Sequence, residues 1–464
     1  MNADESKSRP QQTLPIGPGV HRFDAAGLLT PTANRPNGIL AFAPASLILE
    51  IQPKGGRVLA VGTNADVDHH PAARSLPASH RHELGRVLLM PGLVNAHTHL
   101  DLTHIGPLQA SERGFAGFVD AVRQRRAVEP GDIAASVARG VQLSIAGGVA
   151  VVGDIGGAVR GGASIEPLRA LAASRLRGVS YIEFFALGRT EPAALARLEA
   201  ALALAHGVET ARVRAGLQPH APYSVSPAAY RAALAYRDRP LASHVAESPE
   251  ERRFIAEAQG PQRELLETLG IWSDDLLAEY AKGRTPVEHI APAFRGDLLS
   301  GSMARTPPAP RLVVHLNQLS DLDVQTIAEL DVHVAYCPRA SEYFRAAEYF
   351  GPHRYRELLA LGVTVCLGTD SILNVAAADA DRLTPFDDAA LLFTRDAVPP
   401  RDLLRMMTVH GARAIGLDPR LVSLEPDATP AGLALVAAEV PDPESMLRAA
   451  LQHRHVPWLV AGPF

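Results

Sequence analysis

Eight short apolar segments, each followed by a stretch rich in alanine, leucine and arginine, limit most strongly how this chain can fold. They cover residues 93–99, 148–154, 178–187, 213–219, 241–246, 312–316, 332–337 and 363–369. Continuous apolar strands that alternate with helices are typical of parallel sheets. Eight such units predict an α/β fold, a (β/α)8 TIM-type barrel with its active site at the carboxyl ends of the strands.

An open, doubly wound sheet would show the same alternation of strands and helices. That fold commonly binds phosphate groups with a glycine-rich turn after its first strand. The sequence contains neither a GxGxxG motif nor a Walker A motif. The closed barrel is therefore the preferred interpretation.

Two regions with short hydrophobic runs flank the barrel, which we assign to residues 89–417. They are residues 21–88, where a turn is expected at Gly55 and Gly56, and residues 418–464. Runs of this length between turn residues predict antiparallel strands. We therefore expect one small β-sandwich domain built from both ends of the chain.

Two polar or proline-rich stretches are expected to lack regular structure. Residues 1–20 are polar and contain several prolines, so we expect a disordered N-terminal tail. Residues 283–310 are rich in proline, glycine and serine and lie between the fifth and sixth strands of the barrel. We expect a long loop there, which is a candidate lid over the pocket.

The composition limits which cellular compartment and which partners are expected for the chain. The net charge is −5, from 45 basic and 50 acidic residues, which gives no signature of nucleic-acid binding. The two cysteines, Cys337 and Cys366, favour a reducing compartment over a disulfide framework. No signal peptide and no membrane span is evident. We expect a cytoplasmic protein with a small-molecule partner, and a homodimer as the commonest assembly.

The first strand ends in a pair of histidines. His97 and His99 are two residues apart in the segment NAHTHLDLT. Side chains two apart in a strand lie on the same face, so the two imidazoles can hold one divalent ion together. Alone, such a pair is more often two surface histidines bonded to water.

Later strand ends supply two more candidate ligands, His244 in LASHVAE and Asp370 in LGTDS. Three neutral imidazoles and a carboxylate suit one Zn²⁺ ion, or Fe²⁺, and leave a position for water. His244 could instead be a buried histidine bonded to a carbonyl, and Asp370 could cap the following turn. Because all four residues follow inferred strands, the metal site is the preferred interpretation.

Two further residues suit acid–base chemistry. Glu247 follows His244 closely and could move a proton between the attacking water and a leaving group. His315 ends the sixth strand and could bond the attacking hydroxide or a developing oxyanion. Their structural alternatives are a carboxylate favoured by a helix N-terminus and a histidine packed at the barrel mouth.

These motifs, in this order, resemble those of the metal-dependent amidohydrolase superfamily, and more narrowly its branch of cytosine, guanine and S-adenosylhomocysteine deaminases and triazine chlorohydrolases. The resemblance covers residues 85–417 and implies a barrel with a sandwich built from both termini and one metal ion. It implies three further roles: Glu247 as proton shuttle, His315 assisting the hydroxide, and His220 in the substrate pocket within QPHAPYSVSP. The implied ligands are His97, His99, His244 and Asp370.

Branches of the superfamily with two metal ions usually carry a carboxylated lysine near the fourth strand. No lysine occurs between Lys54 and Lys282. The resemblance therefore implies the single-metal branch. Glu183 is expected at a wall position of the pocket or in the core.

The seventh strand departs from the branch, because it ends in CPRASEYF where an asparagine is usual. Arg339 in this run, and Arg113 after the first strand, are candidate contacts for an anionic part of the substrate. Either could equally be a surface arginine. The run resembles aminodeoxyfutalosine deaminases, whose substrate is an adenine nucleoside with a carboxyphenyl group.

The function expected from the sequence is hydrolytic deamination of an aminopurine-type or related heterocycle by metal-activated water. Two alternatives remain open. One is amide hydrolysis or removal of a chloride-like substituent from another cyclic substrate on the same site. The other is a catalytically silent barrel that binds a ligand or partner, which a missing ligand or shuttle would favour.

Overall fold

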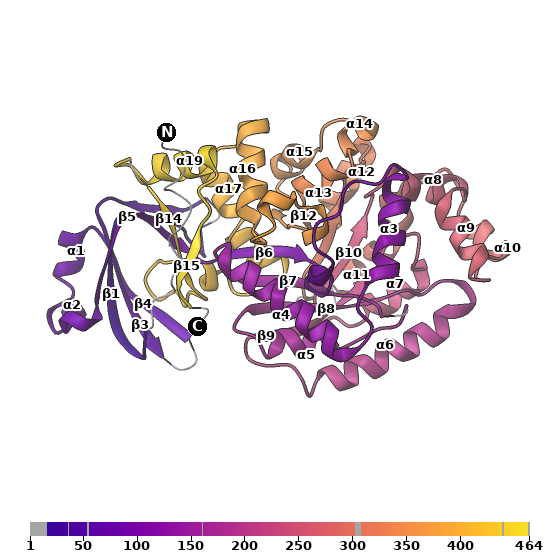
Figure 1. The fold of residues 1–464 in the computed structure, drawn as a ribbon. Coiled ribbons are helices and arrows are strands. Elements are labelled where there is room, and N and C mark those ends of the chain that lie inside the picture. The colour runs from indigo at the N-terminus through magenta and orange to yellow at the C-terminus, as the bar shows by residue number, and fades with distance from the viewer. Residues whose placement is uncertain are drawn as a thin grey trace, which may run out of the picture.

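The computed structural model describes residues 16–462, apart from residues 36, 53–54, 160, 302–307 and 439. The described chain forms two sheets that lie next to each other, a mixed sheet near the chain ends and a parallel sheet surrounded by helices (Figure 1). The predicted tail falls largely outside the described residues. The first strand begins at Gly19, two residues before the predicted start of the flanking domain.

The parallel sheet has eight strands in sequential order, and each overlaps one of the eight predicted segments. The strands are β6 (Leu93–Thr98), β7 (Val149–Gly156), β8 (Arg177–Phe184), β9 (Val213–Pro219), β10 (Leu241–Val245), β11 (Arg311–His315), β12 (His333–Tyr336) and β13 (Val365–Leu367). Neighbouring strands pair in parallel throughout. The α/β architecture with an eight-stranded barrel is confirmed.

The barrel closes just beyond the ends of its first and last strands. Thr98 and Asp370 form an isolated parallel bridge. The His99 N–H donates to the carbonyl of Asp370 at 2.7 Å, and the Thr369 N–H donates to the carbonyl of His97 at 3.0 Å. Closure therefore ties together the backbones of three predicted metal ligands.

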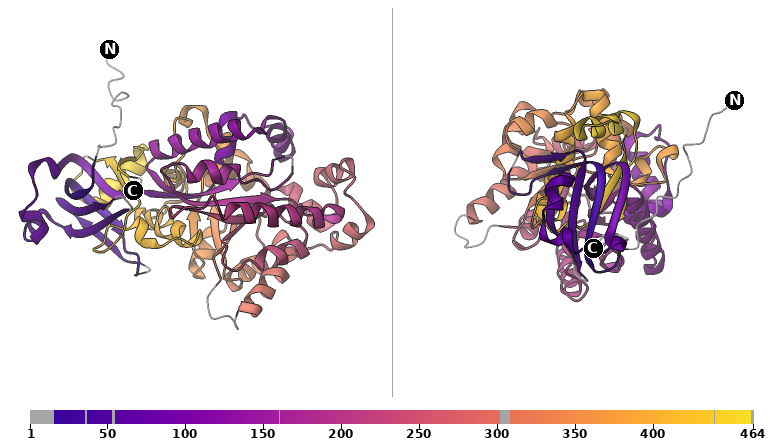
Figure 2. Two further views of the ribbon diagram at one scale, coloured as in Figure 1. Left: turned by 90° about the horizontal axis from the view of Figure 1, so that it is seen from below. Right: turned by 90° about the vertical axis from the view of Figure 1, so that its left-hand side faces the viewer.

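Helices cover the outside of the barrel (Figure 2). Ser226 and Ser248 cap two of them with their hydroxyls, and each is followed by a proline at the first helical position. The helices between and after the strands are α3 (Gly114–Arg125), α4 (Pro130–Ala146), α5 (Glu166–Ala172), α6 (Glu191–Ala205), α7 (Pro227–Leu234), α8 (Pro249–Glu257), α9 (Pro261–Thr268), α10 (Asp274–Glu279), α11 (Pro286–Gly301), α12 (Asp321–Glu329), α13 (Pro338–Tyr343), α14 (Ala346–Phe350), α15 (Tyr355–Ala360), α16 (Pro385–Asp396), α17 (Pro400–Met406) and α18 (Val409–Ala414). Among the described residues, no helix has the length and apolarity needed to cross a membrane.

Strand alternation divides the buried side chains into two clusters. Ala242, Leu312 and Val314 belong to the cluster inside the barrel. Val245 and Val313 belong to the larger cluster between the strands and the helices. The parity of each strand therefore determines which of its residues face the barrel axis.

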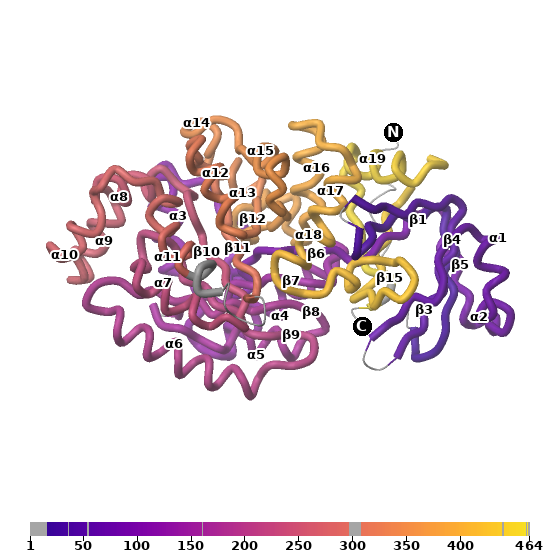
Figure 3. Tube along the Cα trace, turned by 180° about the vertical axis from the view of Figure 1, so that it is seen from behind, coloured from indigo at the N-terminus to yellow at the C-terminus, as the bar shows by residue number. Residues whose placement is uncertain are grey.

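The mixed sheet contains strands from the early and the late part of the chain, and their indigo and yellow segments lie side by side in Figure 3. Its strand order is β15-β14-β5-β1-β3-β4, with β2 paired to β1. The strands are β1 (Gly19–Pro31), β2 (Ile39–Phe42), β3 (Ala45–Gln52), β4 (Gly55–Gly62), β5 (Arg81–Pro91), β14 (Leu433–Ala437) and β15 (Trp458–Ala461), with helices α1 (Asn64–Asp68), α2 (Pro71–Arg74) and α19 (Pro443–His453) beside them.

Two predictions of loops or turns are wrong. The stretch 283–310 contains the 16-residue helix α11, and Val287, Ile290 and Phe294 of this helix pack into the core outside the barrel. A buried helix cannot act as a lid, and residues 302–307 lie outside the described residues. Gly55 and Gly56 belong to strand β4, where they pair with β3, instead of forming the turn.

Candidate active site

Four side chains from three strand ends meet at the carboxyl-terminal mouth of the barrel. His97 ends β6, His244 lies in β10, and Asp370 follows β13. The Asp370 Oδ1 atom is 3.6 Å from the Nε2 atom of His97 and 3.5 Å from that of His99. The His244 ring lies 5.0 Å from the His97 ring and 5.4 Å from the His99 ring, centroid to centroid. The structure thus brings all four predicted ligands together.

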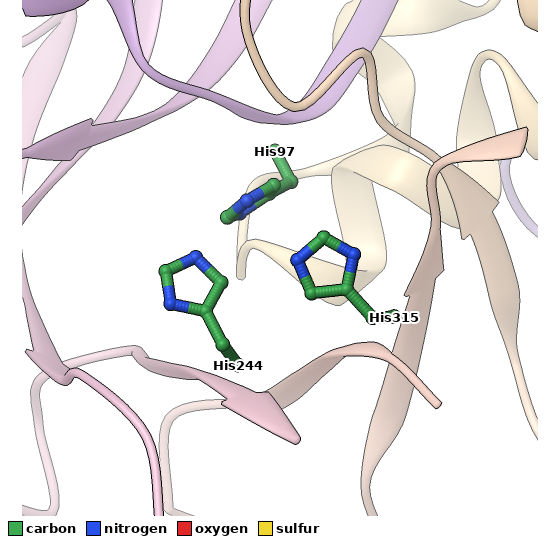
Figure 4. Close-up of side chains that lie close together, drawn as sticks. All are labelled: His97, His244 and His315. Carbon is green, nitrogen blue, oxygen red and sulfur yellow. The ribbon is translucent and has the colours of Figure 1, made fainter. Parts of the chain in front are cut away.

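His315 joins this cluster from the end of β11. Its ring centroid is 5.7 Å from that of His97 and 5.4 Å from that of His244. Each of these three residues offers a nitrogen atom within 4.8 Å of the other two. Figure 4 shows the three rings turned toward one another across the barrel mouth.

The spacing of the cluster fits one small metal ion. Two ligand atoms at about 2 Å from a tetrahedral zinc ion lie about 3.3 Å apart, close to the distances from Asp370. Both ring nitrogens of His97 are buried without a hydrogen-bond partner among the described residues, and so are both of His315. Buried polar atoms without partners are costly, and coordination would satisfy one nitrogen of His97.

Burial keeps the imidazoles in the protonation state that a metal requires. It lowers the pKa of His97 and of His244 to about 3 and that of His99 well below its usual value. Burial raises the pKa of Asp370 to about 6. At neutral pH the cluster therefore presents neutral imidazoles and a carboxylate, which are ligands for Zn²⁺ or Fe²⁺.

The backbone is strained where these groups are presented. Ala246, His315, Leu316 and Asp370 all have a positive φ, between 53° and 74°. Residues other than glycine adopt this region only where the surroundings hold them there, and such positions cluster at functional sites.

Glu247 lies against His315 at the edge of the cluster. Its Oε1 atom is 3.4 Å from the Nε2 atom of His315. Burial raises the pKa of the Glu247 carboxyl well above its usual value, and the charge of Asp370 raises it further. A carboxyl group with a raised pKa can both accept and donate a proton near neutral pH, as a proton shuttle must.

Glu251 fixes the segment that carries Glu247, a role the sequence did not reveal. Its carboxylate accepts hydrogen bonds from the N–H groups of Ala246 and Glu247, at 3.1 and 2.8 Å. The sequence signal for such a role was the position of Glu251, three residues after the helix cap Ser248. The Glu251 carboxylate thus stabilises the turn before the helix.

His220 borders the cluster from the end of β9. Its ring is 5.2 Å from that of His244, and its Nδ1 atom is 2.8 Å from the Ser224 hydroxyl oxygen. The Nε2 atom is 4.0 Å from the carboxylate of Glu183, which in turn lies 3.5 Å from the buried guanidinium of Arg126. Arg126 was missed from the sequence, because it follows a surface helix with no motif around it.

Arg339 and Arg113 do not join the cluster. The Arg339 side chain is buried, donates to the carboxylate of Asp388 at 2.9 Å and lies 3.6 Å from that of Asp387. Arg113 is exposed and pairs with Asp120. Both guanidinium groups thus pair with carboxylates of the chain itself, and their contact with a substrate stays a prediction.

The pairing of Arg339 predicts a structural effect. We expect Arg339→Met to lower the free energy of unfolding by about 3–5 kcal/mol, because it leaves the buried carboxylate of Asp388 without the cation that it pairs with. Arg113→Met, the matched control at an exposed pair, should change it by less than about 0.5 kcal/mol. Urea unfolding checks both. Unchanged stability of Arg339→Met together with a raised KM would instead favour the substrate role.

Burial of His220 predicts a dependence of stability on pH in metal-free protein. Burial lowers its pKa to about 3, whereas the unfolded chain binds this proton below about 6.5. Acid therefore favours unfolding, so stability is full above about pH 6.5 and falls by about 1.4 kcal/mol per pH unit toward pH 3.

The variant His220→Asn lacks the titrating imidazole, so comparing it with the wild type isolates the effect of His220 on stability. Carboxyl groups with a raised pKa, such as Asp370, change the stability in the opposite direction as the pH falls, and they are present in both proteins. We expect the stability of the wild type to fall faster than that of the variant between about pH 6.5 and about pH 4. Urea unfolding at several pH values measures the difference. Parallel pH profiles would contradict the burial of a neutral imidazole at His220.

Comparison with known families places the site in context. The sequence profile of the amidohydrolase family matches residues 88–448, which include the barrel and every residue of the cluster. The chain belongs to the amidohydrolase family. This family is metal-dependent and consists of hydrolases, many of which act on carbon–nitrogen bonds.

Curated relatives of this amidohydrolase are deaminases. An aminodeoxyfutalosine deaminase from Deinococcus radiodurans is 28% identical over 386 residues, which span 78% of this chain and 81% of the relative. A 5'-deoxyadenosine deaminase from Methanothermobacter thermautotrophicus is 28% identical over 357 residues, which span 72% and 71% of the two chains.

Solved structures share the amidohydrolase fold. The aminofutalosine deaminase of Helicobacter pylori superimposes with a TM-score of 0.67 at 17% identity, covering 96% of this chain and 99% of that chain. An adenosine deaminase from Xanthomonas campestris with bound zinc gives a TM-score of 0.68 at 19% identity, covering 96% and 93%. At these identities the likeness establishes the fold.

Proposed function

We propose that this amidohydrolase removes the exocyclic amino group of an adenine-type nucleoside by hydrolysis and releases ammonia. One observation carries the proposal. Two groups of possible ligands share His97, one with His99 and Asp370 and the other with His244 and His315, and the carboxyl group of Glu247 lies beside them in a chain whose family is hydrolytic. The deaminase names of the relatives, which include aminodeoxyfutalosine deaminase, support an adenine nucleoside as substrate.

We propose one divalent ion, Zn²⁺ in preference to Fe²⁺, held by His97, His99, His244 and Asp370. The spacing of the ligand atoms and the neutral imidazoles support this ligand set. A bound zinc ion lowers the pKa of a water molecule toward 7, so that hydroxide is available at neutral pH.

The side chains around the centre supply the proton transfers. Glu247 takes a proton from the attacking water and delivers it to a ring nitrogen of the substrate. Attack on the carbon that bears the amino group gives a tetrahedral centre. Glu247 then takes the remaining proton from the hydroxyl group of the tetrahedral centre and gives it to the amino group, so that the C–N bond breaks, ammonia leaves and a carbonyl group remains. His315, 3.4 Å from Glu247, holds the attacking oxygen, and His220 borders the substrate.

The mixed sheet is proposed to form the predicted sandwich by folding over on itself. The long strand β1 pairs with β3 along its first half and with β2 along its second half. Side chains from β3, β5 and β14, among them Leu47, Leu89 and Leu435, share one apolar cluster. This supports a flanking domain built from residues 21–88 and 418–464, beside a barrel at 89–417.

Ammonia release tests the proposed reaction. Zinc-loaded protein is incubated with aminodeoxyfutalosine, 5'-deoxyadenosine, S-adenosylhomocysteine, guanine and cytosine, and ammonia is measured by a coupled assay. We expect turnover of at least one adenine nucleoside and none of cytosine. Turnover of cytosine or guanine alone would overturn the substrate class, and turnover of none would overturn the deaminase proposal.

A further inference from the structure

His315 faces the barrel mouth only because its backbone is bent. In β11 the side chains of Leu312 and Val314 face the interior, whereas that of Val313 faces the helices. Strand alternation alone would place His315 on the same side as Val313. Its ring instead lies among the rings of His97 and His244.

A tight γ-turn redirects the His315 side chain. Its φ is 74°, and the N–H of Leu316 donates to the carbonyl of Val314 at 3.2 Å across it. A γ-turn with positive φ is rare and strained. Such a conformation persists only where surrounding contacts hold it.

His353, in the segment between α14 and α15, supplies such a contact. Its Nε2 atom lies 2.7 Å from the carbonyl oxygen of His315. The N–H of Tyr355 donates to its Nδ1 atom at 3.0 Å, so the ring proton resides on Nε2 and is donated to the carbonyl. The tautomer of His353 is thus determined by its two backbone partners.

The His353 ring is itself held in place on the outside of the barrel wall. It stacks on Tyr336 with ring centroids 3.8 Å apart and an interplanar angle of 21°. The Tyr336 hydroxyl accepts a hydrogen bond from Arg395 at 3.1 Å. His353 lines a cavity of about 660 Å³ whose lining includes Tyr336 and Tyr355 but none of the clustered ligands.

A second side-chain contact holds the backbone of Glu247, which lies against His315. The Asn317 side-chain amide donates to the carbonyl of Glu247 at 3.0 Å, and the Ser341 hydroxyl donates to Asn317 at 2.6 Å. The backbones of Glu247 and His315 are therefore both held by side chains that do not reach the metal cluster.

We propose that His353 is a positioning residue, which holds the strained backbone of His315 so that its imidazole faces the candidate metal centre. The effect on turnover rests on the proposed function, because it requires His315 to act in the reaction. The effect on the orientation of the His315 ring does not rest on the proposed function.

Two substitutions of His353 separate the hydrogen bond from packing. His353→Phe keeps an aromatic ring for the stack on Tyr336 but cannot donate to the carbonyl. His353→Gln can donate through its side-chain amide and should restore the contact. His289→Leu is the control. His289 lies in α11, away from the cluster, and is a buried histidine whose ring stacks on that of Tyr280.

We expect His353→Phe to lower kcat by about ten- to a hundredfold with KM changed less than about threefold, since small misplacement of a reacting group has effects of this size. His353→Gln should recover most of kcat, and His289→Leu should retain it. Loss of stability in His353→Phe with an unchanged kcat would overturn the proposal and leave a merely structural role.

Crystal structures of the wild type and of His353→Phe provide a readout that does not depend on activity. We expect the variant to lose the hydrogen bond between Leu316 and Val314 and to move the His315 ring away from Glu247. If His353→Phe fails to fold, His353→Leu, whose smaller side chain the cavity accommodates, takes its place. An unmoved ring would overturn the positioning role, whereas a wild type that releases no ammonia would overturn only the proposed function.

Discussion

Replacing Glu247 by glutamine is expected to lower ammonia release by about a hundredfold or more while leaving the metal content unchanged. A glutamine has nearly the same shape as the glutamate but cannot accept and return a proton, and loss of a general acid–base group has effects of this size. Burial and the charge of Asp370 raise the pKa of Glu247, which suits it to this role. The measurement is kcat with zinc-loaded protein, beside metal analysis of the same sample.

Glu257→Gln serves as the matched control. It makes the same chemical change on α8, but at an exposed side chain paired with Arg253. We expect its kcat to equal that of the wild type. If Glu247→Gln turned over substrate at the wild-type rate, Glu247 would have no part in proton transfer.

Replacing His244 by alanine is expected to abolish both metal binding and turnover. His244 belongs to β10 and shares the inward parity of Ala242, so its ring is presented by a rigid strand. Its Nδ1 atom lies 3.1 Å from the carbonyl oxygen of His220, and donation to that oxygen leaves Nε2 for a metal. Removing one of the four proposed ligands would leave too few protein donors to hold the ion. Metal content after dialysis, measured by mass spectrometry, checks the prediction.

His333→Ala is the control for this change. His333 begins β12, so it lies at the opposite end of the barrel from the cluster. We expect this variant to keep its metal and its activity. A full complement of metal in His244→Ala would show that His244 is not a ligand.

Local periodicity was enough to predict the barrel and the meeting of its strand ends. Eight apolar segments gave eight parallel strands, and parallel strands bring their carboxyl ends to one side of the sheet. His97, His99, His244 and Asp370 follow from that geometry, because each lies at or just after a strand end. The closure of the barrel between its first and last strands was implied only by the number of strands.

The orientation of His315 could not be predicted in the same way. Strand parity directs its side chain away from the barrel axis, and only the γ-turn and the contact with His353 explain its actual place. His353 is 38 residues further along the chain. No local pattern in the sequence announces a contact of this kind.

The surroundings of Arg339 and the helix α11 were not predicted, for different physical reasons. Arg339 was a candidate substrate contact because an arginine near a strand end suggests anion binding, whereas its carboxylate partners lie on α16, a contact invisible in the sequence. The helix α11 was missed because proline and glycine content outweighed its periodicity. Val287, Ile290, Ala291 and Phe294 show the i, i+3, i+4, i+7 spacing of a buried helical face.

Anomalous diffraction from a crystal of the zinc-loaded protein tests the central claim most directly. Data recorded on both sides of the zinc absorption edge locate each zinc ion and the atoms around it. We expect a single peak at the barrel mouth with nitrogen atoms of His97, His99 and His244 at about 2.0–2.1 Å and a carboxylate oxygen of Asp370 at about 2.0–2.2 Å. A peak elsewhere, or one that lacks His244 or Asp370 among its ligands, would contradict the account.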